Sequence, residues 1–367
     1  MSLIQGSPSD SFKVSKRLAK VNGEWDWPLQ GFISLYSRSL PRFKESTMKI
    51  GMVSDSLAQL GFTEMLDTAA RLGVEGIEMN SGNWSSARHL DLKTLVASAP
   101  ARAEFLKAFA SRNLKLIALN ANGNQLHPMD GERQSMVLED TVRLAGALGV
   151  KKVCLMSGLP GGAPGDAVPN WMVMAWPPES ARVLKWQWEE KLLPYWRNLA
   201  RLAAQNGVEQ LCVELHGNQL VFNVPSLLRL RKEIGPVVGA NLDPSHLMWM
   251  GANPIAAIDA LGEAIYHVHA KDTFINEAIC ATRSLLENGS LMDIAARSWS
   301  YITLGYGHGE GWWRDFCYRL RMNGYDGWLS IEHEDVMLSC AEGLRRSVDL
   351  LKAVAPAEVS DYAPQPI

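Results

Sequence analysis

Short apolar runs alternate with longer amphipathic segments along most of the chain, beginning at Met48. Eight of the runs have the length and composition of buried strands, at residues 49–53, 76–79, 114–119, 151–156, 210–215, 237–242, 265–270 and 327–331. Helical periodicity occurs between them, for example at residues 63–72, 100–112, 132–148 and 180–206, and again at the end of the pattern at 338–353. Eight strand-helix units over roughly 300 residues predict an α/β fold of the (β/α)8 TIM barrel type, and a doubly wound open sheet is the alternative.

The two ends of the chain differ from this regular middle part. Residues 1–47 carry scattered lysines and arginines among serines, without a sustained strand or helix period. They predict a basic, flexible N-terminal extension. A single barrel domain is expected over residues 48–355, and the proline-containing segment 356–367 is expected to form a C-terminal tail.

Composition argues against several classes of protein. The formal net charge of -3 argues against a nucleic-acid binder, because such proteins usually carry a basic excess. The five cysteines are widely spaced and form no C-x-x-C pair, which is typical of buried residues in a reducing compartment. No apolar run reaches the roughly 20 residues of a membrane helix. We therefore expect a cytoplasmic protein that binds neither nucleic acid nor membranes.

Polar side chains gather where four of the predicted strands end. The motifs V-E-L-H, N-L-D-P-S-H, H-V-H-A-K-D and S-I-E-H-E-D contain Glu214, His216, Asp243, His246, His267, His269, Lys271 and Glu332. Each residue alone is explained by a satisfied buried polar group. Because the carboxyl ends of barrel strands meet at one mouth, the set of Glu214, Asp243, His269 and Glu332 predicts one divalent metal ion. Carboxylates with one imidazole favour Mn2+, with Mg2+, Co2+ or Zn2+ as alternatives.

These four motifs, in this order at the ends of successive strands, resemble the xylose-isomerase-like TIM-barrel superfamily, which includes the sugar phosphate isomerases and epimerases. The resemblance covers roughly residues 48–353. It implies that the four residues hold one ion, that Glu214 and Glu332 flank the substrate carbon that loses and regains a proton, and that His246 contacts substrate hydroxyls. One position departs from the ketose 3-epimerases, in which an arginine follows the metal-binding histidine by six positions, because this chain has Ile275 there.

Three further residues of these motifs are candidates for substrate contacts or catalysis. Residues two apart on a strand point to the same side, so His216 and His267 would share a face with their neighbouring metal ligands. Lys271 suits a proton shuttle or an electrostatic clamp, and a salt bridge to Asp272 or to a neighbouring strand is the alternative.

Three segments outside the metal motifs also carry candidate functions. L-N-A-N-G-N-Q-L-H-P, at 119–128, offers Asn122 and His127 to sugar hydroxyls, or forms turns that cap the next helix. A tryptophan-rich segment between residues 171 and 196 is typical of a lid that excludes water or of an apolar subunit contact, and we expect a homo-oligomer. G-Y-G-H-G-E-G, at 305–311, could cradle a phosphate through backbone amides or form a tight turn.

The chemistry of the predicted site is proton abstraction next to a carbonyl group. We predict a divalent-metal-dependent sugar isomerase or epimerase that works through a metal-stabilised enediolate on a small-molecule sugar or keto-sugar. One alternative is a lyase or dehydratase that eliminates a group from a keto-sugar of the 3-keto-glycoside or inosose type. A nuclease like the abasic-site endonucleases is a remote alternative, and a non-catalytic partner subunit is another.

Overall fold

The computed structural model describes residues 47–362. The predicted N-terminal extension, apart from its last residue, and the last five residues of the predicted tail lie outside this range. Residues 356–362 form no helix or strand. None of the helices between residues 47 and 362 has the length and apolar character needed to cross a lipid bilayer.

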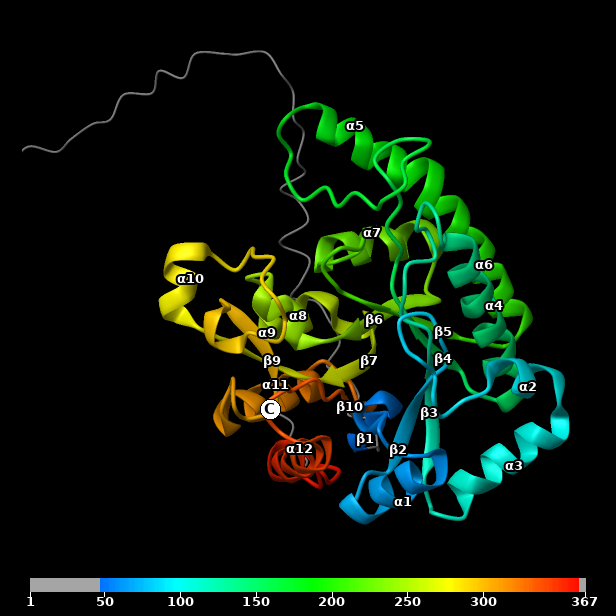
Figure 1. The fold of residues 1–367 in the computed structure, drawn as a ribbon. Coiled ribbons are helices and arrows are strands. Elements are labelled where there is room, and N and C mark those ends of the chain that lie inside the picture. The colour runs from blue at the N-terminus through cyan, green and yellow to red at the C-terminus, as the bar shows by residue number, and fades with distance from the viewer. Residues whose placement is uncertain (1–46, 363–367) are drawn as a thin grey trace, which may run out of the picture. The chain divides into compact units, whose positions relative to one another are not determined.

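Eight parallel strands form a closed barrel (Figure 1). They are β1 (Lys49–Val53), β2 (Gly76–Asn80), β3 (Lys115–Asn120), β4 (Lys152–Leu155), β5 (Gln210–Glu214), β6 (Val238–Leu242), β7 (Ile265–Ala270) and β10 (Trp328–Ile331). β1 pairs with β10 on one side and with β2 on the other, so the sheet has no free edge. This closure confirms the (β/α)8 barrel and excludes the open sheet. Each predicted apolar run forms one of these strands, with ends that differ by at most one residue.

Helices surround the barrel (Figure 1). They are α1 (Phe62–Leu72), α2 (Leu92–Ala97), α3 (Ala99–Ala110), α4 (Gly131–Leu148), α5 (Glu179–Trp186), α6 (Leu193–Gln205), α7 (Val224–Ile234), α8 (Pro244–Trp249), α9 (Pro254–Leu261), α10 (Glu277–Arg283), α11 (Glu310–Met322) and α12 (Cys340–Val354). α5 and α6 are parts of one long helix, joined by a π-helical turn at Gln187–Leu192. The buried Gln187 amide at this turn donates to the carbonyls of Gly161 (3.0 Å) and Asn170 (2.7 Å), which ties the loop after β4 to the helix.

An apolar core fills the space between the strands and the helices. β2 and β6 are buried along their whole length, as expected of parallel strands covered by helices. Trp196 on α6 and Trp313 and Phe316 on α11 are among the largest fully buried side chains. Because the interior is close-packed, this layer holds the strand ends in fixed positions.

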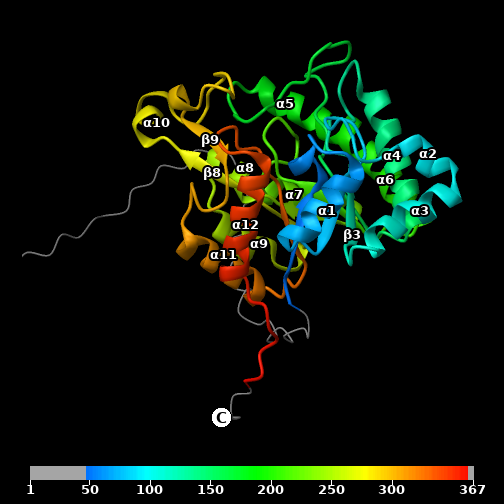
Figure 2. The same cartoon turned by 60° about the horizontal axis from the view of Figure 1, so that its bottom comes forward.

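The long insertion after β7 contains an antiparallel hairpin that the apolar pattern did not predict. β8 (Asp272–Ile275) and β9 (Trp299–Ile302) pair with each other, and α10 lies between them in the chain. Figure 2 shows β8, β9 and α10 together at one side of the barrel. The two strands have four residues each and are joined through residues 276–298, so no local turn signal marks the hairpin.

The buried Asp272 carboxylate connects this hairpin to the loop before α11. Its Oδ2 accepts the backbone N–H groups of Gly305 (3.1 Å) and His308 (2.9 Å) and the indole N–H of Trp313 (3.3 Å). A side chain at Gly307 would collide with Asp272 and its neighbour, so glycine is needed there. The amides of the G-Y-G-H-G-E-G segment thus bind a carboxylate of the same chain, which is the turn interpretation of this segment and not the phosphate cradle.

Candidate metal centre and substrate pocket

Four side chains from four strand ends face one another inside one mouth of the barrel. His269 Nδ1 lies 3.5 Å from Glu214 Oε1, 3.8 Å from Asp243 Oδ2 and 3.3 Å from Glu332 Oε2. One donor atom from each residue lies within 4.8 Å of the other three. The structure therefore brings together the four residues that the sequence assigned to one ion.

Two of these donor atoms have no hydrogen-bond partner although they are buried. Asp243 is the N-cap of α8, and its Oδ1 accepts the N–H of Ser245 at 2.8 Å, which leaves Oδ2 directed at the cluster. His269 Nδ1 is likewise unpaired. Buried polar atoms without a partner are rare and costly, so two of them at one point fit a ligand at that point.

The donor set fits a divalent cation. Three carboxylate oxygens that each lie 3.3–3.8 Å from one imidazole nitrogen are compatible with bonds of about 2.1 Å from nitrogen and oxygen to one ion. The cluster is also rich in buried negative charge, because Glu78 lies beside the three carboxylate ligands. Among the salt bridges of the described residues, Lys271 is the one lysine or arginine paired with this cluster. A divalent ion would balance the excess, which is otherwise unfavourable in a buried site.

The surroundings favour the ionised forms of the carboxylate ligands. Burial alone raises the pKa of Glu214, but the hydrogen bond from His246 and the neighbouring His269 bring it well below its ordinary value. Burial also raises the pKa of Glu332, but the charge of Lys271 and the neighbouring His269 lower it overall. Ionised carboxylates are the form that binds a cation, so these lowered pKa values favour metal binding.

Glu78, in the middle of β2, lies directly behind His269 and was not among the predicted site residues. Its two oxygens are each 3.1 Å from His269 Nε2, and it accepts hydrogen bonds from Ser330 Oγ (2.9 Å) and Asn120 Nδ2 (2.8 Å). A proton on Nε2 that is donated to Glu78 leaves the Nδ1 lone pair directed at the ion. The available signal in the sequence was a glutamate inside an otherwise apolar strand.

His267 differs from the expectation that it contacts substrate. It is fully buried, its Nε2 lies 2.8 Å from Glu78 Oε2, and it is not part of the pocket wall. Glu78, Cys154, His267 and His269 are close enough to share an ion. However, Glu78 already bonds to the Nε2 atoms of both histidines, so this group supports His269 from behind.

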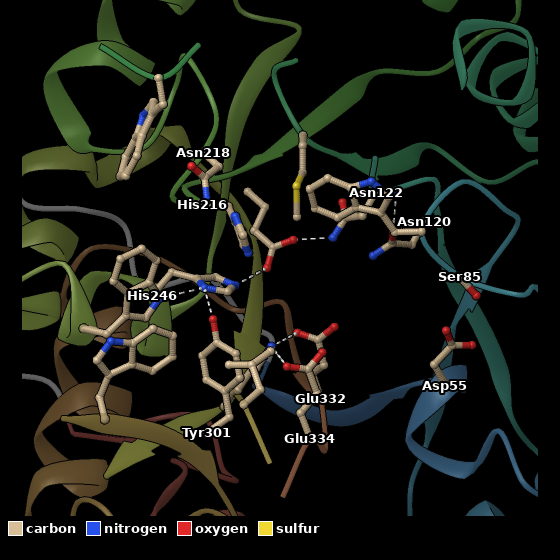
Figure 3. Close-up of a pocket in the computed structure, with 18 of the residues that line it drawn as sticks. Asp55, Ser85, Asn120, Asn122, His216, Asn218, His246, Tyr301, Glu332 and Glu334 are labelled. Carbon is tan, nitrogen blue, oxygen red and sulfur yellow. Dashed lines mark hydrogen bonds and ion pairs between the residues drawn. The ribbon is translucent and has the colours of Figure 1, made fainter. Parts of the chain in front are cut away.

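His246, on α8, connects Glu214 to two aromatic side chains. Its Nδ1 accepts the indole N–H of Trp249 at 3.3 Å and lies 3.0 Å from the Tyr301 hydroxyl (Figure 3). Since an indole can only donate, the imidazole proton is on Nε2, which donates to Glu214 Oε1 at 3.0 Å. The His216 ring packs 4.1 Å from that of His246, and burial lowers the pKa of His216 to about 4, so this imidazole is neutral.

Lys271 lies at the pocket wall between two carboxylates. Its ammonium group is 3.0 Å from Glu332 and 2.7 Å from Glu334, and 4.2 Å from the centre of the Tyr301 ring. Burial alone lowers the pKa of Lys271, but the charges of Glu332 and Glu334 raise it well above its ordinary value. The lysine is therefore a fixed cation beside the ligands. Its salt bridges go to the neighbouring strand, because Glu332 and Glu334 follow β10, which pairs with β7, whereas Asp272 binds the loop before α11.

The loop after β3 contributes one of its two predicted substrate residues to the pocket. Asn122 lines the wall, its amide nitrogen donates to Glu214, and its Oδ1 is unpaired (Figure 3). His127 is not part of the wall. Its Nδ1 accepts the N–H groups of Met129 (3.1 Å) and Asp130 (3.2 Å), so it caps the turn before α4.

An open pocket of about 690 Å³ lies over Glu214 and Glu332. In the tryptophan-rich segment, Trp171 lines this pocket, whereas Trp188 and Trp196 are buried in the core. Trp84, Trp249 and Trp299 also line it and come from other parts of the chain. They were not predicted, because nothing in the local sequence distinguishes a tryptophan at a pocket wall from one in the core.

The closed barrel and the cluster at its mouth define a xylose isomerase-like TIM barrel. Residues 66–354 match the family described by that name, and the chain belongs to this family.

Among relatives by sequence, the uncharacterized protein YfiH of Bacillus subtilis (strain 168) is 46% identical over 308 residues, which are 83% of this chain and 98% of that protein. A solved structure with a similar fold is the probable 3-DHS dehydratase AsbF from Bacillus anthracis, with 18% identity, a TM-score of 0.59, and coverage of 83% of this chain and 99% of that chain. Another is a D-allulose 3-epimerase from Methylomonas sp., with 14% identity, a TM-score of 0.55, and coverage of 84% and 98%. At these identities the two structures share the fold with this chain.

Proposed function

We propose that the protein is a divalent-metal-dependent isomerase or epimerase that removes a proton next to the carbonyl group of a sugar. The observation that carries the proposal is the pair of unpaired buried atoms, Asp243 Oδ2 and His269 Nδ1, beside the carboxylates of Glu214 and Glu332 at an open pocket. A divalent ion bound there, with Mn2+ as the first candidate, would supply Lewis-acid polarisation of substrate oxygen atoms.

Glu214 and Glu332 are the groups that would exchange a proton with the substrate carbon. Glu214 is the last residue of β5 and Glu332 directly follows β10; β6 and β7 separate these strands in the barrel, so the two carboxylates approach the pocket from different strands. Asn122 and His246 hold Glu214, and Lys271 holds Glu332. If one carboxylate takes a proton and the other returns a proton to the same carbon from the opposite face, the result is epimerisation. If the proton is returned to the adjacent carbon of the enediolate, the result is aldose-ketose isomerisation.

Lys271, Asn122, His216 and His246 would hold the substrate in this arrangement. A fixed ammonium group near the reacting carbon stabilises the negative charge that develops on oxygen when the proton leaves. Asn122 and His216 line the wall, where sugar hydroxyls need hydrogen-bond partners. His246 Nε2 donates its proton to Glu214 at 3.0 Å, so this hydrogen bond can respond to a change of charge on Glu214.

A lyase or dehydratase that acts on a keto-sugar is the second candidate, because its reaction begins with the same proton abstraction. The pocket volume of about 690 Å³ favours it, since a sugar ring leaves room for the group that is eliminated. A nuclease of the abasic-site kind requires further histidines at the strand ends. The first histidine after β2 is His89. It makes a hydrogen bond of 3.0 Å with the Leu60 carbonyl and is not part of the pocket wall, so it does not supply such a ligand.

Solvent deuterium exchange tests the proposal. The purified protein is loaded with Mn2+ and incubated in D2O with a panel of aldoses, ketoses and keto-sugars, and mass spectrometry measures deuterium in the recovered sugars. We expect about one Mn2+ per chain, exchange into at least one sugar, and loss of this exchange in Glu214→Gln.

Glu209→Gln is the matched control, because Glu209 lies just before β5 and pairs with Lys151 at the surface (3.0 Å). It should keep both metal and exchange. A protein that binds no Mn2+ after loading, or a Glu214→Gln variant that exchanges at the original rate, would refute the proposal.

A further inference from the structure

The pocket is larger than one sugar ring requires. Its volume of about 690 Å³ lies in the middle of the range that accommodates drug-sized ligands, and a hexose is at the small end of such ligands. Glu214, Glu332, Lys271 and Asn122 carry the proposed reaction and adjoin one another, because Asn122 binds Glu214, Lys271 pairs with Glu332, and the two glutamates belong to one cluster. We call these four residues the polar part of the wall. The remaining volume is therefore available to a second group, attached to the sugar, that does not take part in the proton transfer.

Four tryptophans, Trp84, Trp171, Trp249 and Trp299, also line this wall, among other polar and apolar residues. Trp249 and Trp299 stack on each other with ring centres 4.9 Å apart and planes 9° from parallel. A side chain at Gly217 would collide with the Trp249 indole and lie 3.4 Å from that of Trp171. The absence of a side chain at this position thus lets the indoles on either side approach closely, and both line the pocket.

Trp84 presents a large apolar surface to the pocket in a fixed position. Its side chain is 53% exposed, although its backbone N–H donates to the Asn122 carbonyl at 3.1 Å. The preceding Asn83 donates to the carbonyls of Ala121 (3.1 Å) and Gln134 (3.2 Å), which fixes the loop. The Trp84 ring packs edge-on to His216, 5.9 Å away, so the indole lies beside the polar part of the wall. An exposed, rigidly held indole at a pocket is typical of a surface that contacts a ligand.

The insertion after β7 adds apolar side chains to the same pocket. Leu286 and Leu291 line it and are 69% and 60% exposed. The Glu287 side chain, between them, is 7% exposed and also lines the pocket; it accepts the N–H of Ser298 at 2.6 Å and lies 3.9 Å from Arg297. These contacts hold this part of the insertion at the pocket, where most of the surface of the two leucines is exposed.

We infer that the substrate is a sugar joined to an aromatic group, in other words a glycoside with a flat apolar aglycone. The sugar occupies the polar part of the wall, and the aglycone lies against Trp84 and the insertion leucines. This inference rests on the proposed function, because it takes the metal centre as the sugar subsite. It holds for both candidate reactions, because it concerns the group beside the sugar and not the fate of the abstracted proton.

Binding of matched glycosides to the Mn2+-loaded protein tests the inference. Calorimetry compares methyl and phenyl D-glucopyranosides of both anomeric forms, which lack a carbonyl group and differ in the aglycone. Burial of one phenyl ring predicts that a phenyl glucoside binds on the order of tenfold to a hundredfold more tightly than its methyl counterpart. Trp84→Ala and Leu286→Ala should each reduce this preference and leave methyl glucoside binding unchanged.

Tyr318→Ala is the control, because Tyr318 is equally accessible, at 60% exposed, but lies on α11 and not at the pocket wall. It should keep the full preference. Equal binding of methyl and phenyl glucosides, binding of neither, or a preference that survives both pocket variants overturns the inference. If one of these three outcomes occurs but the unmodified protein binds Mn2+ and exchanges deuterium, only the inference about the aglycone fails. If the unmodified protein neither binds Mn2+ nor exchanges deuterium, the proposed function itself is refuted.

Discussion

Replacing Glu78 by glutamine should weaken metal binding without removing any ligand. Each oxygen of Glu78 lies 3.1 Å from His269 Nε2, so the carboxylate accepts the Nε2 proton and leaves Nδ1 free for the ion. The amide nitrogen of glutamine is a donor. It would compete with the Nε2 proton and favour the tautomer in which Nδ1 is protonated and cannot bind a cation.

The magnitude follows from the hydrogen bond that is lost. A hydrogen bond to a charged group contributes about 1.5–3 kcal/mol. Since about 1.4 kcal/mol corresponds to a factor of ten in affinity, and supporting residues of this kind typically change metal affinity 10- to 100-fold, we expect a loss of about 10- to 100-fold. The fold should be less stable as well, because Glu78 also accepts from Ser330, Asn120 and His267.

Competition with a fluorescent chelator gives the Mn2+ affinity, and circular dichroism checks the fold. Ser330→Ala is the matched control, because it removes a 2.9 Å hydrogen bond to Glu78 but keeps the charge beside His269. It should lower stability and leave the Mn2+ affinity close to that of the unmodified protein. The reasoning is wrong if folded Glu78→Gln binds Mn2+ as tightly as the unmodified protein, or if Ser330→Ala weakens binding equally.

Three further outcomes are expected. Removing metal with a chelator should lower the melting temperature, because an ion present at about 100 times its Kd stabilises the fold by about 2.7 kcal/mol; an unchanged melting curve would contradict the buried site. Asp272→Asn should destabilise the protein by about 2–4 kcal/mol in urea unfolding, because it removes the charge that three backbone amides and an indole N–H bind, whereas the exposed Asp349→Asn should have little effect. Lys271→Met should lower turnover about 100-fold while metal analysis still finds the ion, because the cation beside Glu332 is lost and the ligands remain. Turnover close to that of the unmodified protein would show that Lys271 is a structural ion pair.

The strand ends were predictable because they depend on local patterns. A buried barrel strand is a short apolar run, and a polar side chain at its end, such as Glu214, or just past its end, such as Asp243 and Glu332, stands out against that run. Glu78 was missed for the opposite reason: it lies inside a strand, where its partners come from three other strands that only the closed barrel brings near. His127 was assigned to the pocket because its loop follows a strand end, and the direction of its side chain depends on a hydrogen bond within the turn.

The amino-acid sequence by itself determined the eight strands and the four side chains that could share an ion, because each follows from periodicity and from where polar residues interrupt it. It also predicted the barrel, with an open sheet as the alternative that the closed strand pairing excludes. The tertiary structure alone decided which atoms face one another. In the folded protein, the His269 ring lies between Glu78 and the three carboxylate ligands, and the amides of the G-Y-G-H-G-E-G segment donate to Asp272. Trp84, Trp171, Trp249 and Trp299, from distant parts of the chain, line one pocket. Contacts between residues far apart in the chain carry no local signal, since they depend on how the barrel closes and on the direction of each side chain within it.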